Sequence, residues 1–330
     1  MPDKVIAGLP SGLIKIETAI KLIKKGEYLS IAGDAKLLAK LPKGNWIGGS
    51  IPYFMGPRGG ESSLTEVFVH RLGVPGEVPT IKSYDITNLD HICLDAPDNG
   101  YSLIILPGFS EVHAYYARNA PNFDQMFMKP IVGWVSGVHL DHLADEEPIV
   151  FDGRSGTESS EAAMVMHIPL PENFHAHVDI INGMQQSHGP SITFPSTGFS
   201  VTTAVIEGKE QNFGSYLLQN KVDIQKPLVA DYCGAQVNVS IREVDEKSGR
   251  VDFYAPVFSD SEYRIGEGKL PVLKGLEGKD ATFSCNCVLN YLYENLEGKY
   301  TAGYTGPMTF GEIAYLLLNQ TLVHLSIVRT

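Results

Sequence analysis

Short runs of alternating apolar and polar residues dominate this chain, and only a few stretches carry apolar residues at helical spacing. Between residues 11 and 26 the apolar positions recur every three or four residues, which predicts a helix that ends at Gly26. A shorter helix is expected over residues 34–41, a longer one over 110–127 and a fourth near 211–219. Helices are therefore expected to be minor elements between strands.

The predicted strands fall into two series separated by "PLPEN" at residues 169–173. The first series is "NWIGGSIPYFM" (45–55, broken by its glycine pair), "TEVFVHRL" (65–72), "YSLIILPGF" (101–109), "KPIVGWVSGV" (129–138), "EEPIVFDG" (146–153) and "EAAMVMHIPL" (161–170). The second is "FHAHVDIIN" (174–182), "FSVTTAVIEG" (199–208), "AQVNVSIREV" (235–244), "GRVDFYAPVF" (249–258), "ATFSCNCVLNYLYENLEG" (281–298, strand into helix) and "TLVHLSIV" (321–328). We expect an α+β fold of two mixed-sheet modules with flanking helices, residues 1–170 and 171–330.

Composition narrows the class of partner. The 330 residues carry a formal net charge of −12, which argues against nucleic acid because phosphate binding relies on clustered Lys and Arg. The best apolar run is about half the length that a membrane-spanning helix needs. Four cysteines in so long a chain do not suggest a disulfide framework. We expect a cytoplasmic protein that neither binds nucleic acid nor spans a membrane.

Several motifs, in order, resemble the FIST sensory family, with both its N-terminal and its C-terminal module. The first module of that family has segments similar to "WIGGSIPYFM" and "PIVGWVSGVHLDHLADEEPIVFDG". The second has segments similar to "FSVTTAVIEG", the cysteine after a Phe-Ser pair at Cys285, and a Gly-Glu turn before a terminal "NQT" strand. The resemblance covers most of residues 28–328 and implies a small-molecule sensor.

The resemblance also implies a ligand site in the cleft between the two modules. Its residues would be Glu312 beside Gly311, with Arg58 at the other polar end, Trp46, Tyr53 and Tyr304 on the walls, and Cys285 beneath. Two departures matter. Asn286, Cys287 and Val288 follow Cys285 where relatives often have an arginine, and we expect no fused output domain of the kind that many relatives carry. A signal would then pass to a partner protein.

Histidines are the remaining candidates for a cofactor or metal site. "SEVH" supplies His113, and "HLDH" places His139 and His142 three residues apart in an acidic, turn-like loop. Imidazole nitrogens ligate transition metals and haem iron. Solvated loop residues are the simpler interpretation, so no metal is expected, the cofactor is left unknown, and a haem-binding gas sensor stays as an alternative.

Two further alternatives belong to other classes of protein. Ser110 follows an apolar strand and precedes a helix, as a hydrolase nucleophile does, but Val112 stands where that motif requires glycine, which favours Ser110 as a helix N-cap. A thiol-dependent enzyme would use Cys285, although a buried structural cysteine is the simpler interpretation. A structural or assembly protein is the third alternative, and exposed strand edges are compatible with a homo-oligomer.

Overall fold

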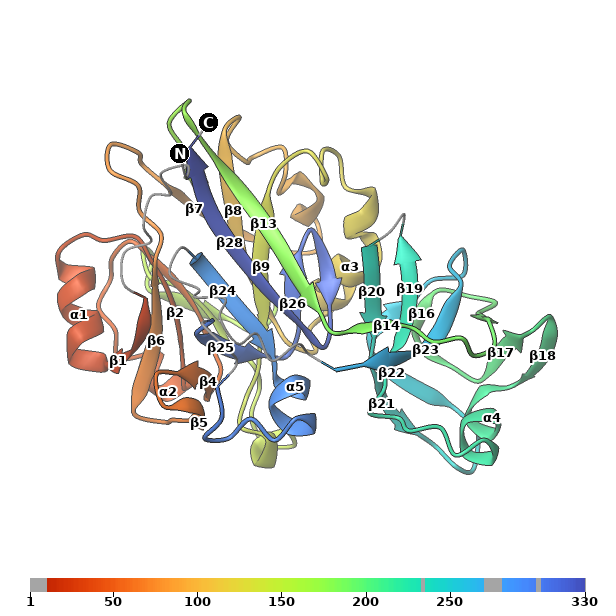
Figure 1. Ribbon diagram of the computed structural model, residues 1–330. Helices are drawn as coiled ribbons and strands as arrows, with labels where there is room; N and C mark the ends of the chain where they lie inside the picture. The colour runs from red at the N-terminus through yellow and green to blue at the C-terminus, as the bar shows by residue number, and fades with distance from the viewer. Residues whose placement is uncertain (1–10, 233–234, 270–280, 301–303, 330) are drawn as a thin grey trace. The chain divides into compact units, whose positions relative to one another are not determined.

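The computed structural model describes residues 11–232, 235–269, 281–300 and 304–329 (Figure 1). About 46% of the chain is strand and 15% is helix, which confirms the predicted α+β class. The chain forms two compact units. Unit 1 takes its described residues from Met1–Ile180, Val272–Leu316 and Leu322–Thr330, and unit 2 from Ile181–Pro271 and Leu317–Thr321. The chain therefore does not divide at the expected boundary between residues 170 and 171.

Three sheets account for most strands of unit 1. The first has the order β1 (Gly12–Lys15), β6 (Glu66–Arg71), β2 (Leu29–Gly33), β3 (Trp46–Ser50), β10 (Val150–Asp152), β11 (Thr157–Ser159). The second has the order β27 (Leu316–Leu318), β26 (Glu312–Ala314), β9 (Ile131–Ser136), β8 (Gly100–Pro107), β12 (Ala163–Pro169), β7 (Thr80–Tyr84). The third has the order β13 (Phe174–Asn182), β28 (Thr321–Arg329), β24 (Ala281–Cys287), β25 (Gly306–Thr309), β4 (Tyr53–Gly56), β5 (Gly59–Ser62).

The third sheet explains why the division differs from the expected one. Its strand β25 comes from the C-terminal half of the chain and pairs antiparallel with β4 from the N-terminal half, with Gly306 opposite Met55. The second sheet is joined in the same way, because β26 pairs with β9. Strands from both halves of the chain thus complete the same sheets.

Three pairs of neighbouring strands in unit 1 run parallel, and a short helix follows the first strand of each pair. They are β2–β3 with α2 (Ala35–Leu38), β8–β9 with α3 (Glu111–Asn119), and β24–β25 with α5 (Val288–Tyr293). A parallel pair needs such a crossover because the chain must return to the same end of the sheet. The segments that follow β2, β3 and β9 line one hollow of about 330 Å³.

Unit 2 is built almost entirely of antiparallel strands. One sheet has the order β18 (Lys209–Asn212), β17 (Thr203–Ile206), β15 (Ile192–Thr193), β23 (Tyr263–Gly268), β19 (Leu228–Tyr232), β20 (Ala235–Val239), and β14 (Met184–Gln186) also pairs with β23. A three-stranded sheet consists of β16 (Gly198–Val201), β22 (Val251–Val257) and β21 (Ile241–Val244). The helix α4 (Phe213–Gln219) begins at its N-cap, Asn212.

Most predicted elements are present, with informative shifts at their ends. The first helix, α1, covers Ile16–Lys24, because the residues before it form β1 and pair with β6. The helix expected to reach residue 127 stops at Asn119, where the 3₁₀ turn η2 (Ala120–Asn122) begins with a proline inside it. The two glycines expected to break the strand at 45–55 lie inside β3 instead.

The cores of unit 1 lie along its central strands. All eight residues of β8 are buried, as the apolar run predicted for a strand covered on both faces. Another core surrounds β2, β3 and β6, where Trp46 packs with Ile31 and Phe151. Among the helices of the described residues, none is both long and apolar enough to cross a bilayer.

Candidate functional site

A cleft of about 860 Å³ opens at the carboxyl ends of the parallel strands β8 and β9. The turn that follows β8 forms one side of it, from Gly108 to Glu111 at the start of α3. In open sheets with parallel strands, ligands bind outside the carboxyl ends of the strands, because the loops there diverge and leave a crevice. The cleft lies wholly within unit 1 and has the size of a pocket for a small molecule.

The turn after β8 holds Phe109 in a conformation that places its ring outward. Its φ of 63° lies in the left-handed region, and the residue is 56% exposed. The backbone N–H of Phe109 donates to Nδ1 of His113 over 3.3 Å, and its ring meets that of Phe310 edge-on with centroids 5.8 Å apart. A non-glycine residue in this region costs energy unless its surroundings hold it.

Ser110 is the N-cap of α3, as the sequence predicted. Its Oγ accepts a hydrogen bond from the N–H of His113 over 3.1 Å and donates to the carbonyl of Pro107 over 2.6 Å. The hydroxyl is thus engaged on both sides within the helix start. This arrangement favours a structural role over that of a nucleophile.

The opposite side of the cleft is a loop that we call the strap, residues 138–148. Its residues from Leu143 to Pro148 line the cleft. Lys36 in α2 holds the strap from outside, since Nζ of Lys36 lies 2.8 Å from Oε1 of Glu146. The backbone N–H of Leu140 donates to the hydroxyl of Tyr53 over 3.0 Å. The strap therefore links the loops of β2 and β4 to the cleft.

Acidic side chains dominate the lining of the cleft. The described lining residues include no Lys, Arg or His. They include six carboxylates: Asp85, Glu111, Asp145, Glu146, Glu147 and Glu161. A hydrogen bond from the Thr87 hydroxyl holds the pKa of Asp85 below its usual value. The hydrogen bond and charge of Lys36 lower the pKa of Glu146. Such carboxylates stay ionised near neutral pH and give the cleft a negative field.

The residues predicted around Glu312 form a buried cluster rather than the wall of a groove. Glu312 lies in strand β26, not in a turn, and its side chain is fully buried and accepts from Oγ1 of Thr309 over 3.4 Å. Gly311 precedes it, and its carbonyl accepts from the N–H of Val135 over 2.9 Å. The pairing of β26 with β9 sets Glu312 opposite Trp134, which is why the acid points into the interior.

Cys285 shares the surroundings of Glu312. Its Sγ lies 3.4 Å from the carbonyl oxygen of Gly133, to which the thiol donates. Burial, the charge of Glu312 and the neighbouring Cys287 together raise the pKa of the Cys285 thiol. A thiol with a raised pKa and no exposed surface is a poor nucleophile.

This burial gives a prediction about thiol reactivity. We expect iodoacetamide at pH 8 to leave Cys93, Cys285 and Cys287 unmodified in the native protein, because all three are buried. Burial also raises the pKa of Cys93 to about 11. Mass spectrometry of peptides before and after urea treatment measures this, with labelling of all three after unfolding as the control. Fast labelling of Cys285 in the native protein would contradict this prediction and support the alternative of a thiol-dependent enzyme.

The aromatic residues predicted as walls lie in three different surroundings. Trp46 is in the core of the first sheet, where its Nε1 donates to the carbonyl of Pro42 over 2.9 Å. Tyr53 stacks obliquely on Tyr291 and His139, with centroids 5.5 and 5.4 Å away. Tyr304 packs on His324 at 4.7 Å. The structure does not bring these rings into one open pocket.

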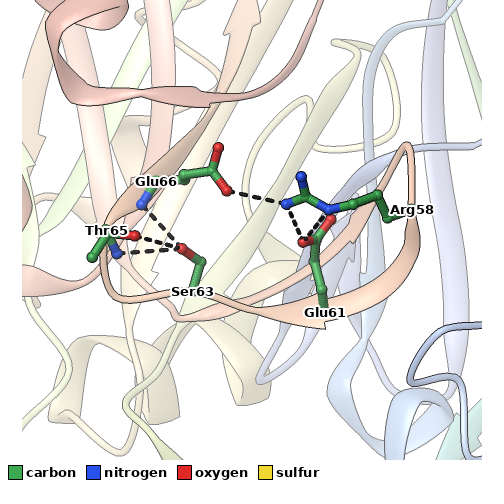
Figure 2. Close-up of polar contacts among 5 residues, drawn as sticks. All are labelled: Arg58, Glu61, Ser63, Thr65 and Glu66. Atoms are coloured by element: carbon green, nitrogen blue, oxygen red, sulfur yellow. Dashed lines mark hydrogen bonds and ion pairs between the residues drawn. The ribbon is translucent and has the colours of Figure 1, made fainter.

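Arg58 lies at the turn between β4 and β5 and forms ion pairs with two carboxylates (Figure 2). Its Nη2 lies 2.6 Å from Oε2 of Glu61 and 3.2 Å from Oε2 of Glu66. In the loop between β5 and β6, Oγ of Ser63 accepts from the N–H groups of Thr65 and Glu66. Arg58 thus closes a hairpin rather than offering a free charge to an anion.

The three histidines considered for a metal do not come together. His113 is buried in α3, and burial lowers its pKa to about 4. His139 and His142 lie on the strap, with ring centroids 5.4 Å apart, and Nδ1 of His142 is 3.6 Å from Oε2 of Glu146. Within the described part of the chain, no three His, Cys, Asp or Glu residues form a group able to hold a metal ion.

A buried chain of hydrogen bonds that the sequence did not suggest crosses the second sheet. Nδ1 of His167 lies 2.8 Å from Oγ of Ser102, and its Nε2 lies 2.8 Å from the hydroxyl of Tyr84. Tyr84 in turn donates to Oδ2 of Asp95 over 2.8 Å. This direction requires His167 to carry its proton on Nε2 and to accept from Ser102. Burial lowers the pKa of His167 to about 4, so the ring is neutral in the folded state.

The cleft itself has no compact sequence motif. Its acids come from the turn after β7, the start of α3, the strap and the segment before β12, which are far apart along the chain. The acidic "ADEE" of the strap is the nearest signal in the sequence, and its composition is also that of an ordinary solvated loop. Only the pairing of the strands brings these segments together.

Comparison with known protein families assigns the chain to a family. A search of curated proteins finds no significant match. A family model matches residues 14–328, which is nearly all of the chain and includes every residue of the cleft. By that match the chain belongs to the family of unknown function DUF6976.

Proposed function

We propose that this protein binds a small organic polycation in the cleft at the carboxyl ends of β8 and β9. The observation that supports the proposal is the lining of that cleft, about 860 Å³ with six carboxylates and no basic side chain among its described residues. Ammonium groups are the natural partners of such a surface, because each can be shared among several carboxylate oxygens. Like charges that line one cleft also repel one another, and a bound cation relieves that repulsion.

The apolar residues of the cleft narrow the ligand class further. Phe109, Ile86 and Leu143 line the cleft, and these residues are 56%, 42% and 47% exposed. A chain of methylene groups can cover such surfaces while ammonium groups at its ends reach the acids. Linear aliphatic polyamines combine both features in one flexible molecule. The net charge of −12 would attract them from a distance.

As for the biological role, we propose a cytoplasmic sensor. The motifs similar to the FIST family support this, because that family is sensory, and the strap offers a segment whose position a ligand can bias. The signal would leave through a partner protein, with a homo-oligomer as one form of that partnership.

The test uses spermidine as the probe and isothermal titration calorimetry as the measurement. We expect binding by the wild type at low ionic strength, weakening as salt screens the charges. A triple variant, Glu111→Gln, Glu147→Gln and Glu161→Gln, keeps the shapes but removes three exposed charges of the cleft. We expect it to bind at least about tenfold more weakly, a change of about 1.4 kcal/mol.

The control is Glu172→Gln, which removes an exposed charge of unit 1 away from the cleft. It should bind spermidine like the wild type. If the triple variant and the control bind equally well, the cleft is not the site. If the wild type shows neither heat of binding nor a raised melting temperature with millimolar spermidine, polyamine binding itself is refuted.

A further inference from the structure

One buried serine holds both ends of the strap. The N–H of Ser50 donates to the carbonyl of Ile149 over 2.8 Å, and its Oγ accepts from the N–H of Ile149 over 2.9 Å. On the other side, the N–H of Gly137 donates to the carbonyl of Ser50 over 2.7 Å, and Oγ of Ser50 donates to the carbonyl of Gly137 over 2.8 Å. Ser50 is 2% exposed, so water does not replace these bonds.

This arrangement depends on a hydroxyl at residue 50. A hydroxyl donates one hydrogen bond and accepts others at the same time, which is what the two ends of the strap require. Alanine would keep the two backbone bonds but leave the N–H of Ile149 and the carbonyl of Gly137 short of a partner. Unpaired buried groups of this kind weaken the local structure.

The position of the strap decides where half of the cleft's acids lie. Asp145, Glu146 and Glu147 are strap residues, and Glu146 and Glu147 also line a neighbouring hollow of about 330 Å³ that reaches Ser50 itself. The opposing acid Glu111 belongs to α3 and does not depend on the strap. A strap released from Ser50 would change the distances between these two groups of charges.

We propose that Ser50 is a positioning residue of the polycation site: it fixes the strap so that the strap carboxylates face Glu111 of α3. The inference rests on the proposed function. It adds a specific role for a residue at the end of β3, whose side chain lies outside the polycation cleft. The affinity for the ligand would then depend on how tightly the hydrogen bonds of Ser50 hold the strap.

The first measurement needs no ligand. Hydrogen–deuterium exchange should show faster exchange across residues 138–149 in Ser50→Ala, with the strands β8 and β12 unchanged. Ser136→Ala is the matched control, because Ser136 also ends a buried strand but its Oγ has no partner within the described residues. Equal exchange in Ser50→Ala and the wild type would overturn the inference.

The second measurement is spermidine affinity. We expect Ser50→Ala to bind about tenfold more weakly than the wild type, Ser50→Thr to restore most of the loss, and Ser136→Ala to bind normally. In a double-mutant cycle with Glu147→Gln, the two losses should not add, because Ser50 acts through the strap carboxylates. Additive losses would refute the positioning role. So would an unchanged spermidine affinity in a Ser50→Ala protein whose strap exchanges hydrogen faster.

Two outcomes separate this inference from the proposed function. If the wild type binds no spermidine, both fail, whereas normal binding by the wild type and Ser50→Ala alike removes only the role of Ser50. Should Ser50→Ala not fold, Tyr53→Phe serves instead, because it removes the hydroxyl that accepts from the strap at Leu140. It should accelerate exchange at Leu140 and weaken spermidine binding, and normal behaviour in both would contradict the inference.

Discussion

Lowering the pH from 7.5 to 4.5 is expected to unfold unit 1, because three of its histidines are buried in the neutral state. Burial lowers the pKa of His70 to about 3 and those of His113 and His167 to about 4. His70 lies between the rings of Phe68 and Phe283, with centroids 4.9 and 4.8 Å away. All three histidines are buried, so a protonated ring would lose most of its hydration.

The direction of the effect follows from where each state binds protons. Below about pH 6.5 an unfolded histidine takes up a proton, while the folded one does not until the pH approaches 4. Stability therefore falls as the pH drops through this window, and it is not changed by these groups above it. Each histidine contributes up to about 1.4 kcal/mol per pH unit, and three contribute roughly 4 kcal/mol per pH unit. Over the two pH units from 6.5 to 4.5 the loss is roughly 8 kcal/mol, comparable to a typical domain stability of about 5–15 kcal/mol.

Urea titrations at several pH values measure this, with tryptophan fluorescence as the probe. The chain has two tryptophans, Trp46 and Trp134, and both are buried in unit 1, so the signal reports that unit. Replacing His70 by glutamine should reduce the slope by about one proton, and the exposed His175→Gln should leave it unchanged. A stability that stays flat from pH 6.5 to 4.5 would contradict the neutral burial of these rings.

Gly133→Ala is expected to prevent unit 1 from folding stably. A Cβ on residue 133 would lie 1.9 Å from the carbonyl oxygen of Ile104, its partner across the parallel pair β8–β9. The clash involves backbone on both sides, so no side-chain rotation relieves it, and the two central strands must separate. The carbonyl of Gly133 would also move away from the Cys285 thiol. We expect a loss of more than about 3 kcal/mol.

The matched control is Gly12→Ala, in the edge strand β1. A Cβ there meets no heavy atom within 4 Å, so the same chemical change should alter stability by no more than about 0.5 kcal/mol. Soluble yield and urea denaturation of the two variants give the comparison. A Gly133→Ala protein as stable as Gly12→Ala would show that β8 and β9 are not packed as closely as the structure has them.

The local elements were largely predictable because they depend on near neighbours in the sequence. The unbroken apolar run of β8 required burial on both faces, and Ser110 before α3 had the composition of an N-cap. The proline inside η2 explains why α3 stops early, although the periodicity alone suggested a longer helix.

The candidate site was not predictable in the same way, because it depends on which strands become neighbours. The Gly311–Glu312 pair had the composition of a turn, but its pairing with β9 made it a buried strand. In the sequence Arg58 has the character of a free cation, but in the structure it forms an ion pair with Glu66. The acids of the cleft are spread from Asp85 to Glu161, and no spacing along the chain marks them as a group.

The pairing of β25 with β4 has a consequence for how the polypeptide matures during translation. While the ribosome is still making residues 181–271, β4 has no partner on the side that β25 will occupy, and β9 lacks β26. Nascent unit 1 must therefore wait with open strand edges until residues 306–329 emerge, a period in which such edges attract other chains. Chaperones that shield exposed strand edges would protect the N-terminal half at this stage.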